Sequence, residues 1–368
     1  MAKKKVGIVT FHTADNYGAV LQAFALQNFI SKNSDYDVRI IDFNTPSHEA
    51  EHCVIKKKRS VLRTIFYGAL NMLFYFPLKS RINKFASFRN NYLRLTSKKY
   101  NSTDVFLNNM EEFDYYISGS DQVFNPKVKF KECYYLGFNK RKGLKIAYAP
   151  SFGLSIFTPE EQTFIRSMVS DFDYLSCREK NGAEFLSQLT NLPVPIVCDP
   201  VFLLTKKEWE SIAEIKSFDK PFIFVYDLNG GKNLIDLAHK ISRLNGNMQI
   251  ICMTTRTDLF YRGVSVVRNL GPCELLSYIK ASSYVVTDSF HGTSLSLILQ
   301  KRVVSYIAAL TTSSRVISLL SSLHIEDQLV YSLDKFDWNS IKFNNYTNFL
   351  NDYVKKSINY LNTALSIK

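Results

Sequence analysis

The sequence lacks the closely spaced cysteines of a metal site or a disulfide framework. It contains six cysteines in 368 residues, with no CxxC pair and no histidine nearby at metal-ligand spacing. Several lie in apolar runs, as free buried thiols do. We therefore expect no metal site built on these cysteines and a reducing, cytoplasmic compartment. The six are Cys53, Cys133, Cys177, Cys198, Cys252 and Cys273.

Signals for export and for dinucleotide binding are also missing. The opening MAKKKVGIVTF passes from lysines directly into a strand-like run, without the apolar core or cleavage site of a signal peptide. No GxGxxG motif follows a strand, so a dinucleotide cofactor is not supported. The net charge of +13 comes with no nucleic-acid-binding motif, so nucleic acid is a weaker partner than an anionic substrate or an anionic membrane face.

One stretch, Val61–Leu78, is strongly apolar and aromatic. Arg63, Asn71 and Pro77 interrupt it before it reaches the ~20 apolar residues that a transmembrane helix needs. Two interpretations are open: a hairpin buried against the N-terminal domain, or a helix in the membrane interface whose basic flanks meet anionic head groups. The second predicts peripheral contact with the inner membrane face. The flanking basic residues are Lys56–Arg59, Lys79 and Arg81.

Two series of short β-branched and aromatic runs alternate with helical stretches, which is typical of α/β proteins with parallel sheets. The first series predicts strands at Lys5–Phe11, Val38–Phe43, Tyr115–Ser118, Lys145–Ala149, Tyr174–Cys177 and Ile196–Cys198. The second predicts strands at Phe222–Tyr226, Gln249–Met253, Val264–Val267, Tyr284–Thr287 and Val303–Ile307. We predict an N-terminal domain over 1–205, a second over 206–340, and a C-terminal helix over 341–368 that packs back on the body.

The segment Gly7–Gln27 reads as a strand, a polar loop and an apolar helix. Its loop places polar side chains at the carboxyl end of the first strand, where open parallel sheets bind ligands. The alternative is a capped first turn, with Asp15 or Asn16 as the N-cap and His12 bonded to a neighbouring loop. The candidate ligand-binding residues are His12, Asp15, Asn16, Tyr17 and Gly18.

A second polar loop follows the strand at Tyr115–Ser118, and an arginine ends the run at Tyr174–Cys177. The loop residues Ser118, Ser120, Asp121 and Gln122 could bind sugar hydroxyls, although the same residue types form ordinary turns. Arg178 offers a fixed fork for a carboxylate or phosphate. Its alternative role is a salt bridge to Glu179 or another acid.

The sharpest candidate site is Tyr284–Thr293, YVVTDSFHGT, which predicts a buried strand, a short polar turn and a helix starting near Ser294. Ser289, Gly292, Thr293 and Ser294 would then offer N–H and hydroxyl groups to an anion. His291, beside them, can transfer a proton near neutral pH.

Arg315 is predicted in the first turn of the following helix. A cation there opposes the helix dipole, which favours an arginine held for a bound anion over one that stabilises the helix. The alternative is a solvated side chain.

Several of these segments together resemble the polysaccharide pyruvyl transferase family. They occur in the family order between about residues 5 and 325, and the ordered set is specific. They are TFHTADNYGAVLQ, YISGSDQVFNP, KIAYAPSFG, SCREKNG, CDPVFLL and VVTDSFHGTSLSLILQK. The chain departs from the family pattern at Cys177 and in the Val61–Leu78 insertion.

The resemblance implies two Rossmann-like domains facing each other across a cleft in the GT-B arrangement. It also implies phosphoenolpyruvate as the donor substrate and no cofactor. His291 is the implied catalytic histidine, Arg178 a donor ligand and Arg315 a second donor ligand. Asp15 or Asp121 is the candidate base, and the acceptor is a sugar of a bacterial surface or capsular polysaccharide precursor, such as a lipid-linked oligosaccharide. The leading alternative function is a GT-B glycosyltransferase that uses a nucleotide sugar; a binding module without turnover is the other.

Overall fold

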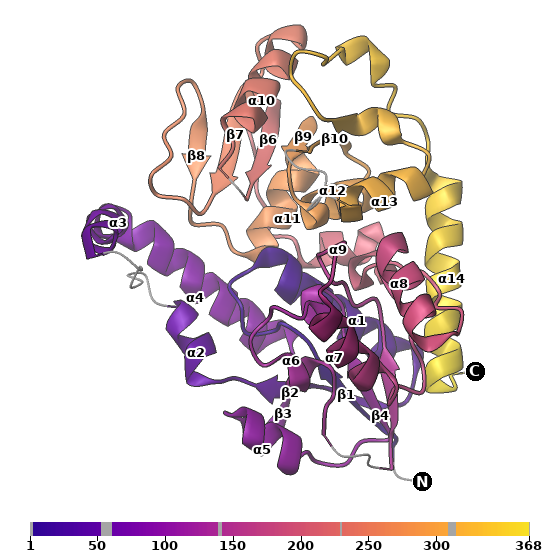
Figure 1. Cartoon of the computed structure of the whole chain (residues 1–368). Helices are drawn as coiled ribbons and strands as arrows, with labels where there is room; N and C mark the ends of the chain where they lie inside the picture. The colour runs from indigo at the N-terminus through magenta and orange to yellow at the C-terminus, as the bar shows by residue number, and fades with distance from the viewer. Residues whose placement is uncertain (1–2, 53–60, 139–141, 229, 308–313, 368) are drawn as a thin grey trace. The chain divides into compact units, whose positions relative to one another are not determined.

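The computed structural model describes residues 3–52, 61–138, 142–228, 230–307 and 314–367 (Figure 1). The chain forms two compact units. Unit 1 comprises residues 1–49, 92–204 and 347–368, and unit 2 comprises residues 50–91 and 205–346. The expected domain boundary near residue 205 coincides with one of the points at which the chain passes from unit 1 to unit 2. The units differ from the expected division in two segments, since 50–91 belongs to unit 2 and the C-terminal helix belongs to unit 1.

Unit 1 is built on a five-stranded parallel sheet with the strand order β3-β2-β1-β4-β5. Its strands are β1 (Lys5–Val9), β2 (Asp37–Phe43), β3 (Leu95–Tyr100), β4 (Tyr115–Ser118) and β5 (Leu144–Ala147). Its helices are α1 (Tyr17–Asn33), α2 (Pro46–Glu49), α5 (Thr103–Asn108), α6 (Lys131–Tyr134), α7 (Pro159–Val169), α8 (Lys180–Thr190) and α14 (Thr347–Leu365), with 3-10 turns at η2 (Gln122–Phe124) and η3 (Pro200–Leu203). Because β1 lies between β2 and β4, the strand order reverses at β1 and β4.

Unit 2 is built on a six-stranded parallel sheet with the order β11-β10-β9-β6-β7-β8. Its strands are β6 (Phe222–Asp227), β7 (Gln249–Thr254), β8 (Ser265–Val267), β9 (Tyr284–Thr287), β10 (Arg302–Tyr306) and β11 (Leu329–Val330). Its helices are α3 (Val61–Leu73), α4 (Tyr75–Tyr92, which ends at the boundary with unit 1), α9 (Lys206–Ile212), α10 (Lys232–Leu244), α11 (Pro272–Ala281), α12 (Phe290–Ile298) and α13 (Ser314–Ser322), with 3-10 turns at η1 (Ala50–His52), η4 (Glu326–Gln328) and η5 (Trp338–Ser340). The order reverses between β6 and β9.

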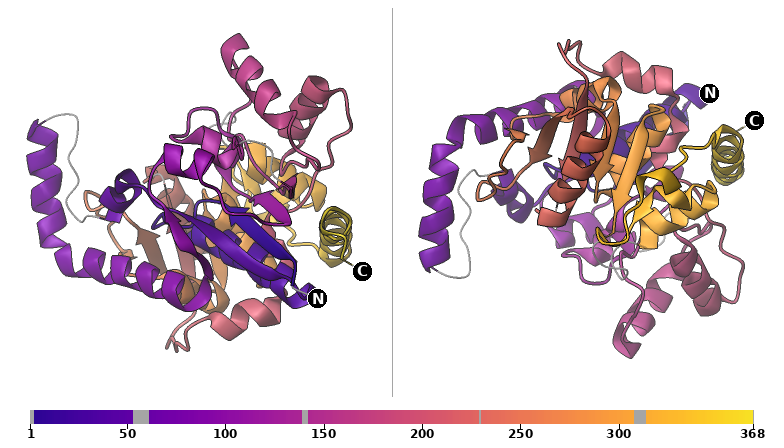
Figure 2. Two further views of the ribbon diagram at one scale, coloured as in Figure 1. Left: turned by 90° about the horizontal axis from the view of Figure 1, so that it is seen from below. Right: turned by 90° about the horizontal axis from the view of Figure 1, so that it is seen from above.

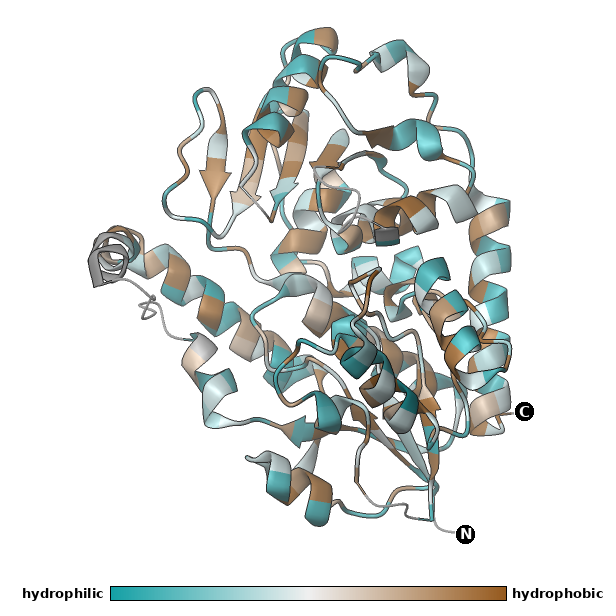
Figure 3. Ribbon diagram, viewed as in Figure 1, coloured by the Kyte–Doolittle hydropathy of each residue, from teal (hydrophilic) through white to brown (hydrophobic). Residues whose placement is uncertain are grey.

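The central strands of unit 2 are apolar on both faces. Every residue of β6 and of β9 is buried, and Figure 3 shows these strands in brown. Helices on both faces of a parallel sheet require such runs, because neither face meets water. Two predicted strands do not form: Tyr174 and Cys177 each make only an isolated bridge, and Cys177 pairs with Ile196.

The described cysteines are free thiols, and most are buried as expected. Cys133, Cys177, Cys198 and Cys252 are buried, and Cys273 is partly exposed. Burial raises the pKa of the Cys133 and Cys198 thiols to about 12. Cys53 lies outside the described residues. The thiols of Cys133 and Cys198 are therefore neutral at physiological pH, as packed core residues are.

The C-terminal helix packs on unit 1, as the sequence predicted for a helix returning to the body. The Oγ of Ser357 accepts a hydrogen bond of 2.8 Å from the buried N–H of Cys198. The hydroxyl of Tyr360 donates to the carbonyl oxygen of Ala147 at 2.9 Å. Thus α14 supplies an acceptor for the N–H of Cys198 and a second donor to the carbonyl oxygen of Ala147, which also accepts from the hydroxyl of Ser176.

Ser357→Ala is therefore expected to lower the free energy of unfolding by about 1–3 kcal/mol, since it leaves the N–H of Cys198 buried without an acceptor. Thr363, on the exposed side of the same helix, offers the control, and Thr363→Ala should change stability by less than about 0.5 kcal/mol. Urea unfolding of both variants measures the difference. Equal effects would show that Ser357 does not support unit 1.

Candidate functional site

The candidate residues fall into two groups, one in each unit, and each group lies where the strand order of its sheet reverses. In unit 1 the loops after β1 and β4 carry the polar residues. In unit 2 most of them follow β9, and Arg315 lies on α13, after β10. Ligands of open α/β sheets bind at such switch points, beyond the carboxyl ends of the strands. The topology therefore places both regions where sheets of this kind bind ligands, and the binding roles of the residues stay predictions.

In the loop after β1, hydrogen bonds hold the candidate residues in place. Nε2 of His12 lies 3.4 Å from Oδ1 of Asp42, and Nδ1 lies 3.2 Å from the carbonyl oxygen of Thr10. Asn16 is the N-cap of α1, and its Oδ1 accepts from the N–H of Ala19 at 3.3 Å. This is the capped first turn that the sequence offered as an alternative.

The other residues of this loop differ in exposure. Tyr17 and Gly18 are buried in the first turn of α1, Asp15 is half-buried, and Asn16 is exposed. A sugar hydroxyl could reach Asn16 and Asp15 more readily than Tyr17 or Gly18. The role of these residues in acceptor binding stays a prediction.

The loop after β4 contains a strained residue. Asp121 has φ 72° and ψ −166°, a conformation that is accessible almost only to glycine and that costs about 1–3 kcal/mol for other residues. Its carbonyl oxygen accepts from the N–H groups of Val123 and Ser151, each at 2.8 Å. Such strain persists when the surroundings impose it, and it is often found at functional sites.

Arg178 is buried in unit 1, and three carboxylates lie near its guanidinium group. Its Nη1 pairs with Oδ2 of Asp199, and its Nη2 lies 3.4 Å from Oδ1 of Asp121. Its Nε lies 4.0 Å from Oε2 of Glu179. The Oγ of Ser120 donates to Asp199 at 3.1 Å. We name Ser120, Asp121, Arg178, Glu179 and Asp199 the carboxylate cluster.

The charges of this cluster decide the ionisation of Arg178. Burial alone would lower its pKa, but the three carboxylates outweigh burial and hold the pKa above its usual value. The guanidinium is therefore permanently charged, and its N–H groups pair with carboxylates of the protein. This is the salt-bridge arrangement that the sequence offered as the alternative role, and donor binding by Arg178 stays a prediction.

The remaining residues of this loop make local contacts. Ser118 donates through its Oγ to the carbonyl oxygen of Tyr134 at 2.8 Å and is fully buried. Oε1 of Gln122 accepts from the side chain of Asn125 at 3.2 Å. Ser118 thus serves the fold, whereas Gln122 is half-buried and closer to solvent.

In unit 2, the helix after β9 begins earlier than the sequence predicted. Helix α12 starts at Phe290, with Ser289 as its N-cap, and the expected start near Ser294 is wrong. The N–H of Gly292 donates to Oγ of Ser289 at 3.2 Å, and the N–H of Thr293 donates to the carbonyl oxygen of Ser289 at 2.9 Å. These N–H groups are used inside the helix, so they are not the groups that would meet an anion.

The hydroxyl groups of this helix also point inward. Oγ1 of Thr293 lies 2.8 Å from Oγ of Ser305, and Oγ of Ser294 donates to the carbonyl oxygen of Phe290 at 2.9 Å. Hydroxyls that bond within the helix and to β10 fix its position on the sheet. Their role as direct donor ligands stays a prediction that this geometry does not favour.

His291 occupies the second position of α12 and is buried. The helix starts directly after β9, and Oδ1 of Asp288 accepts from the N–H of Leu228, just after β6, at 3.1 Å. This bond joins the two loops that follow β6 and β9. The guanidinium carbon of Arg315, in the first turn of α13 as predicted, lies 6.0 Å from the ring centre of Phe290. The structure therefore places Arg315 beside the start of α12.

Gly292 allows this tight start. A Cβ at this position would lie 2.6 Å from Oγ1 of Thr287 and 2.7 Å from the ring of Tyr226. No real Cβ makes such contacts, so only glycine lets the first turn of α12 lie against β6 and β9.

Gly292→Ala is expected to lower the free energy of unfolding by about 1–3 kcal/mol and to lower activity by displacing His291. Gly68→Ala is the matched control, because nothing lies within 4 Å of a Cβ there; in a helix the change should be neutral or stabilising by up to about 1 kcal/mol. Thermal unfolding and turnover of both variants test this. An unchanged Gly292→Ala enzyme would contradict the close packing.

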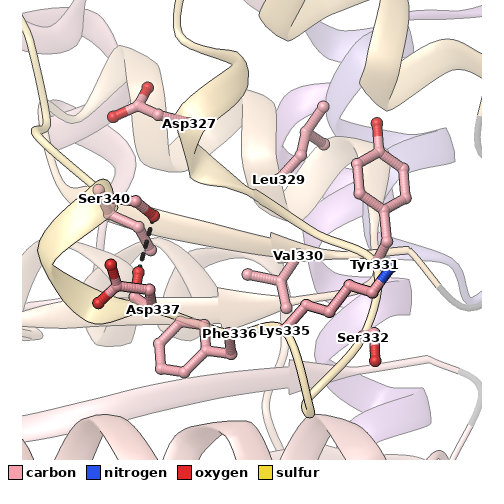
Figure 4. Close-up of a pocket in the computed structure, with 10 residues that line it drawn as sticks. Asp327, Leu329, Val330, Tyr331, Ser332, Lys335, Phe336, Asp337 and Ser340 are labelled. Carbon is pink, nitrogen blue, oxygen red and sulfur yellow. Dashed lines mark hydrogen bonds between the residues drawn. The ribbon is translucent and has the colours of Figure 1, made fainter.

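A separate pocket of about 150 Å³ opens at the edge strand β11 (Figure 4). It contains none of the candidate residues, and its polar groups are partly used internally: the hydroxyl of Ser340 donates to the carbonyl oxygen of Asp337 at 2.7 Å. Among the described residues, no group of three or more histidine, cysteine or acidic side chains is placed to hold a metal ion.

Sequence reasoning missed Asp199, Asp42 and Thr10. Asp199 lies in the CDPVFLL segment, where an acid between a buried cysteine and a proline was the available signal. Thr10 joins the two loops of unit 1, since its Oγ1 donates to the carbonyl oxygen of Ser120 at 3.2 Å and accepts from the side chain of Gln22 at 2.7 Å.

The family model for polysaccharide pyruvyl transferase matches residues 16–308, which include every candidate residue except His12, Asp15 and Arg315. The chain belongs to the polysaccharide pyruvyl transferase family. This membership makes the protein a transferase by family. No curated protein sequence matches the chain significantly.

Solved structures similar to this chain share its fold. The S. aureus MnaA–UDP co-structure matches with a TM-score of 0.54 and 12% identity, covering 100% of this chain and 98% of that chain. A putative UDP-N-acetylglucosamine 2-epimerase from Listeria monocytogenes matches with a TM-score of 0.50 and 12% identity, covering 98% of this chain and 88% of that chain. At this identity the likeness shows the fold alone: two parallel-sheet, Rossmann-like units of the GT-B type.

Proposed function

We propose that this member of the polysaccharide pyruvyl transferase family moves the pyruvyl group of phosphoenolpyruvate onto two hydroxyls of a sugar and releases phosphate. The observation that carries the proposal is the family match over residues 16–308, with His291 at the switch point of the unit 2 sheet. The acceptor is a sugar of a polysaccharide precursor, and a lipid-linked oligosaccharide is the form we favour. No cofactor enters the proposal.

The donor requires at least two positive or N–H-rich points, because it carries a carboxylate and a phosphate. Arg315 supplies a positive charge, and the first turn of α12 supplies the N–H-rich point. Arg315 lies beside Phe290. A helix N-terminus carries a partial positive charge that stabilises an anion. These groups support a donor site in unit 2.

The reaction begins with protonation of the donor's methylene carbon, and His291 is the proposed proton donor. A sugar hydroxyl then forms a C–O bond to the adjacent carbon and loses its proton to a base, for which Asp15 and Asp121 remain the candidates. The second hydroxyl attacks the same carbon, the C–O bond to phosphate breaks, and phosphate leaves with the proton of that hydroxyl. The base gives its proton to solvent, and solvent protonates His291 again. General acid catalysis of this kind contributes typically about 10²–10⁴-fold.

Donor binding separates this proposal from a nucleotide-sugar glycosyltransferase of the same fold. Phosphoenolpyruvate should raise the midpoint of thermal unfolding, since a ligand that binds only the folded state stabilises it by about 2.7 kcal/mol at one hundred times its Kd. UDP-sugars should have no effect. Stabilisation by UDP-sugars and none by phosphoenolpyruvate would replace pyruvyl transfer with glycosyl transfer.

A further inference from the structure

The first half of the chain contains a long stretch without acidic residues. No aspartate or glutamate occurs between Glu51 and Asp104. Helices α3 and α4 lie inside this stretch and carry only basic charges. Its lysines and arginines are Lys56, Lys57, Lys58, Arg59, Arg63, Lys79, Arg81, Lys84, Arg89, Arg94, Lys98 and Lys99. The positive charge of the chain is therefore concentrated in one segment.

Large apolar side chains are exposed where α3 meets α4. Met72 is 59% exposed, Leu73 71% and Phe76 83%, and Phe260, in the loop after β7, is 68% exposed. We call these four residues the apolar tip. Figure 2 shows α3 turning away from the axis of α4, and Figure 3 shows brown and teal bands alternating along α4. The second half of Val61–Leu78 therefore does not form the buried hairpin that was one interpretation of the sequence. The side chains of residues 61–66 lie outside the described residues.

The apolar tip is held in place by specific contacts within unit 2. The ring centre of Phe74 lies 6.0 Å from that of Phe260, and the buried guanidinium of Arg268 lies 4.5 Å from Phe74. Nη2 of Arg268 donates to the carbonyl oxygen of Leu259 at 2.6 Å. The Oγ1 of Thr257 donates to Oδ1 of Asn71 at 2.9 Å. These contacts therefore hold the apolar tip at the surface of unit 2.

Basic and polar groups adjoin the apolar tip. An open hollow of about 480 Å³ runs along one face of α4 and begins at Phe76. Its lining residues are Phe76, Lys79, Ser80, Asn83, Lys84 and Ser87. Lys79 is exposed one turn after Phe76, Lys84 pairs with Glu274, and Arg262 is exposed two residues after Phe260. Such ammonium, hydroxyl and amide groups can donate hydrogen bonds to phosphate oxygens.

We propose that the apolar tip docks the protein on an anionic lipid bilayer, with Leu73 and Phe76 entering the interface and Lys79 and Arg262 meeting phosphate head groups. Exposed apolar residues ringed by basic charge are what interfacial binding requires. Within the described residues, no helix is long and apolar enough to cross a membrane. The contact is peripheral, and it does not depend on the proposed reaction.

A second copy of the chain fits this surface less well. A two-fold interface brings the same patch against itself. Here it would set Lys79 and Arg262 against identical charges, with no acid on α3 or α4 to balance them. An anionic surface supplies the complementary charge.

The test is co-sedimentation of the full chain with vesicles of phosphatidylcholine alone and of phosphatidylcholine mixed with phosphatidylglycerol. We expect binding to the anionic vesicles only, weakened by salt. Leu73→Ser/Phe76→Ser should lower the partition coefficient by roughly tenfold or more, and Lys79→Glu should also lower it. Ile215→Ser, at a fully exposed apolar residue of unit 2 (102%), is the matched control and should bind like the wild type.

Three results would overturn the proposal: no dependence on phosphatidylglycerol, equal partition of the double variant and the wild type, or a dimer in solution that Leu73→Ser/Phe76→Ser dissociates. The last would assign the apolar tip to a second copy. Thermal unfolding of each variant confirms that it is folded. Turnover of a water-soluble acceptor is measured in parallel, so failure of membrane binding and failure of the proposed reaction are distinguished.

Discussion

His291→Ala is expected to lower kcat/KM for acceptor-dependent phosphate release from phosphoenolpyruvate by roughly 10²–10⁴-fold, the usual contribution of a general acid or base. His291 lies in the first turn of α12, at the switch point of the unit 2 sheet, where the helix N-terminus favours an anion. Steady-state release of phosphate by wild type and variant measures the effect.

His239 provides the matched control for this prediction. It lies on α10 and is half-buried, so His239→Ala removes the same side chain from the same unit without touching the switch point. It should keep activity within about twofold, since substitutions away from a site change little. Equal losses in both variants, or full activity of His291→Ala, would remove His291 from the chemistry.

Arg178→Met is expected to lower the free energy of unfolding by about 3–5 kcal/mol, because it leaves buried carboxylates without their cation. Arg178 is itself buried and pairs with Asp199 and Asp121. Urea unfolding followed by circular dichroism measures the change.

Arg94→Ala is the control for this effect, since Arg94 lies at the surface and pairs with Asp37 at 3.4 Å. An exposed pair contributes about 0–1 kcal/mol. Arg178→Lys then separates support of the fold from donor binding: a ligand role predicts a raised KM for phosphoenolpyruvate in a folded variant, whereas a supporting role predicts lower stability with KM unchanged. Wild-type stability of Arg178→Met would contradict the carboxylate cluster.

The central strands could be predicted from the sequence because they are short, β-branched and buried on both faces. Tyr115–Ser118 and Tyr284–Thr287 have the predicted bounds. The edge strand β3, LTSKKY, was not predicted, since half of its residues face solvent and its composition is polar. Tyr174–Cys177 has the composition of a strand, yet its residues make only isolated bridges.

Side-chain partners were harder to predict than backbone elements. The sequence identified Arg178 and Asp121 as candidates, but Asp199, the other carboxylate that pairs with Arg178, comes from another segment. The start of α12 was predicted four residues too late. Ser289 caps the helix, and Gly292 lies inside its first turn, packed closely against Thr287 and Tyr226. Such facts depend on contacts between distant segments, which composition and spacing do not encode.

The central claim is that the pyruvyl group of phosphoenolpyruvate reaches the sugar. The most direct test is mass spectrometry of a hexose glycoside after incubation with the protein and carbon-labelled phosphoenolpyruvate. We predict a labelled three-carbon unit on the acceptor, with one phosphate released for each unit transferred. An unlabelled acceptor, together with transfer of a hexose from a UDP-sugar, would contradict the account.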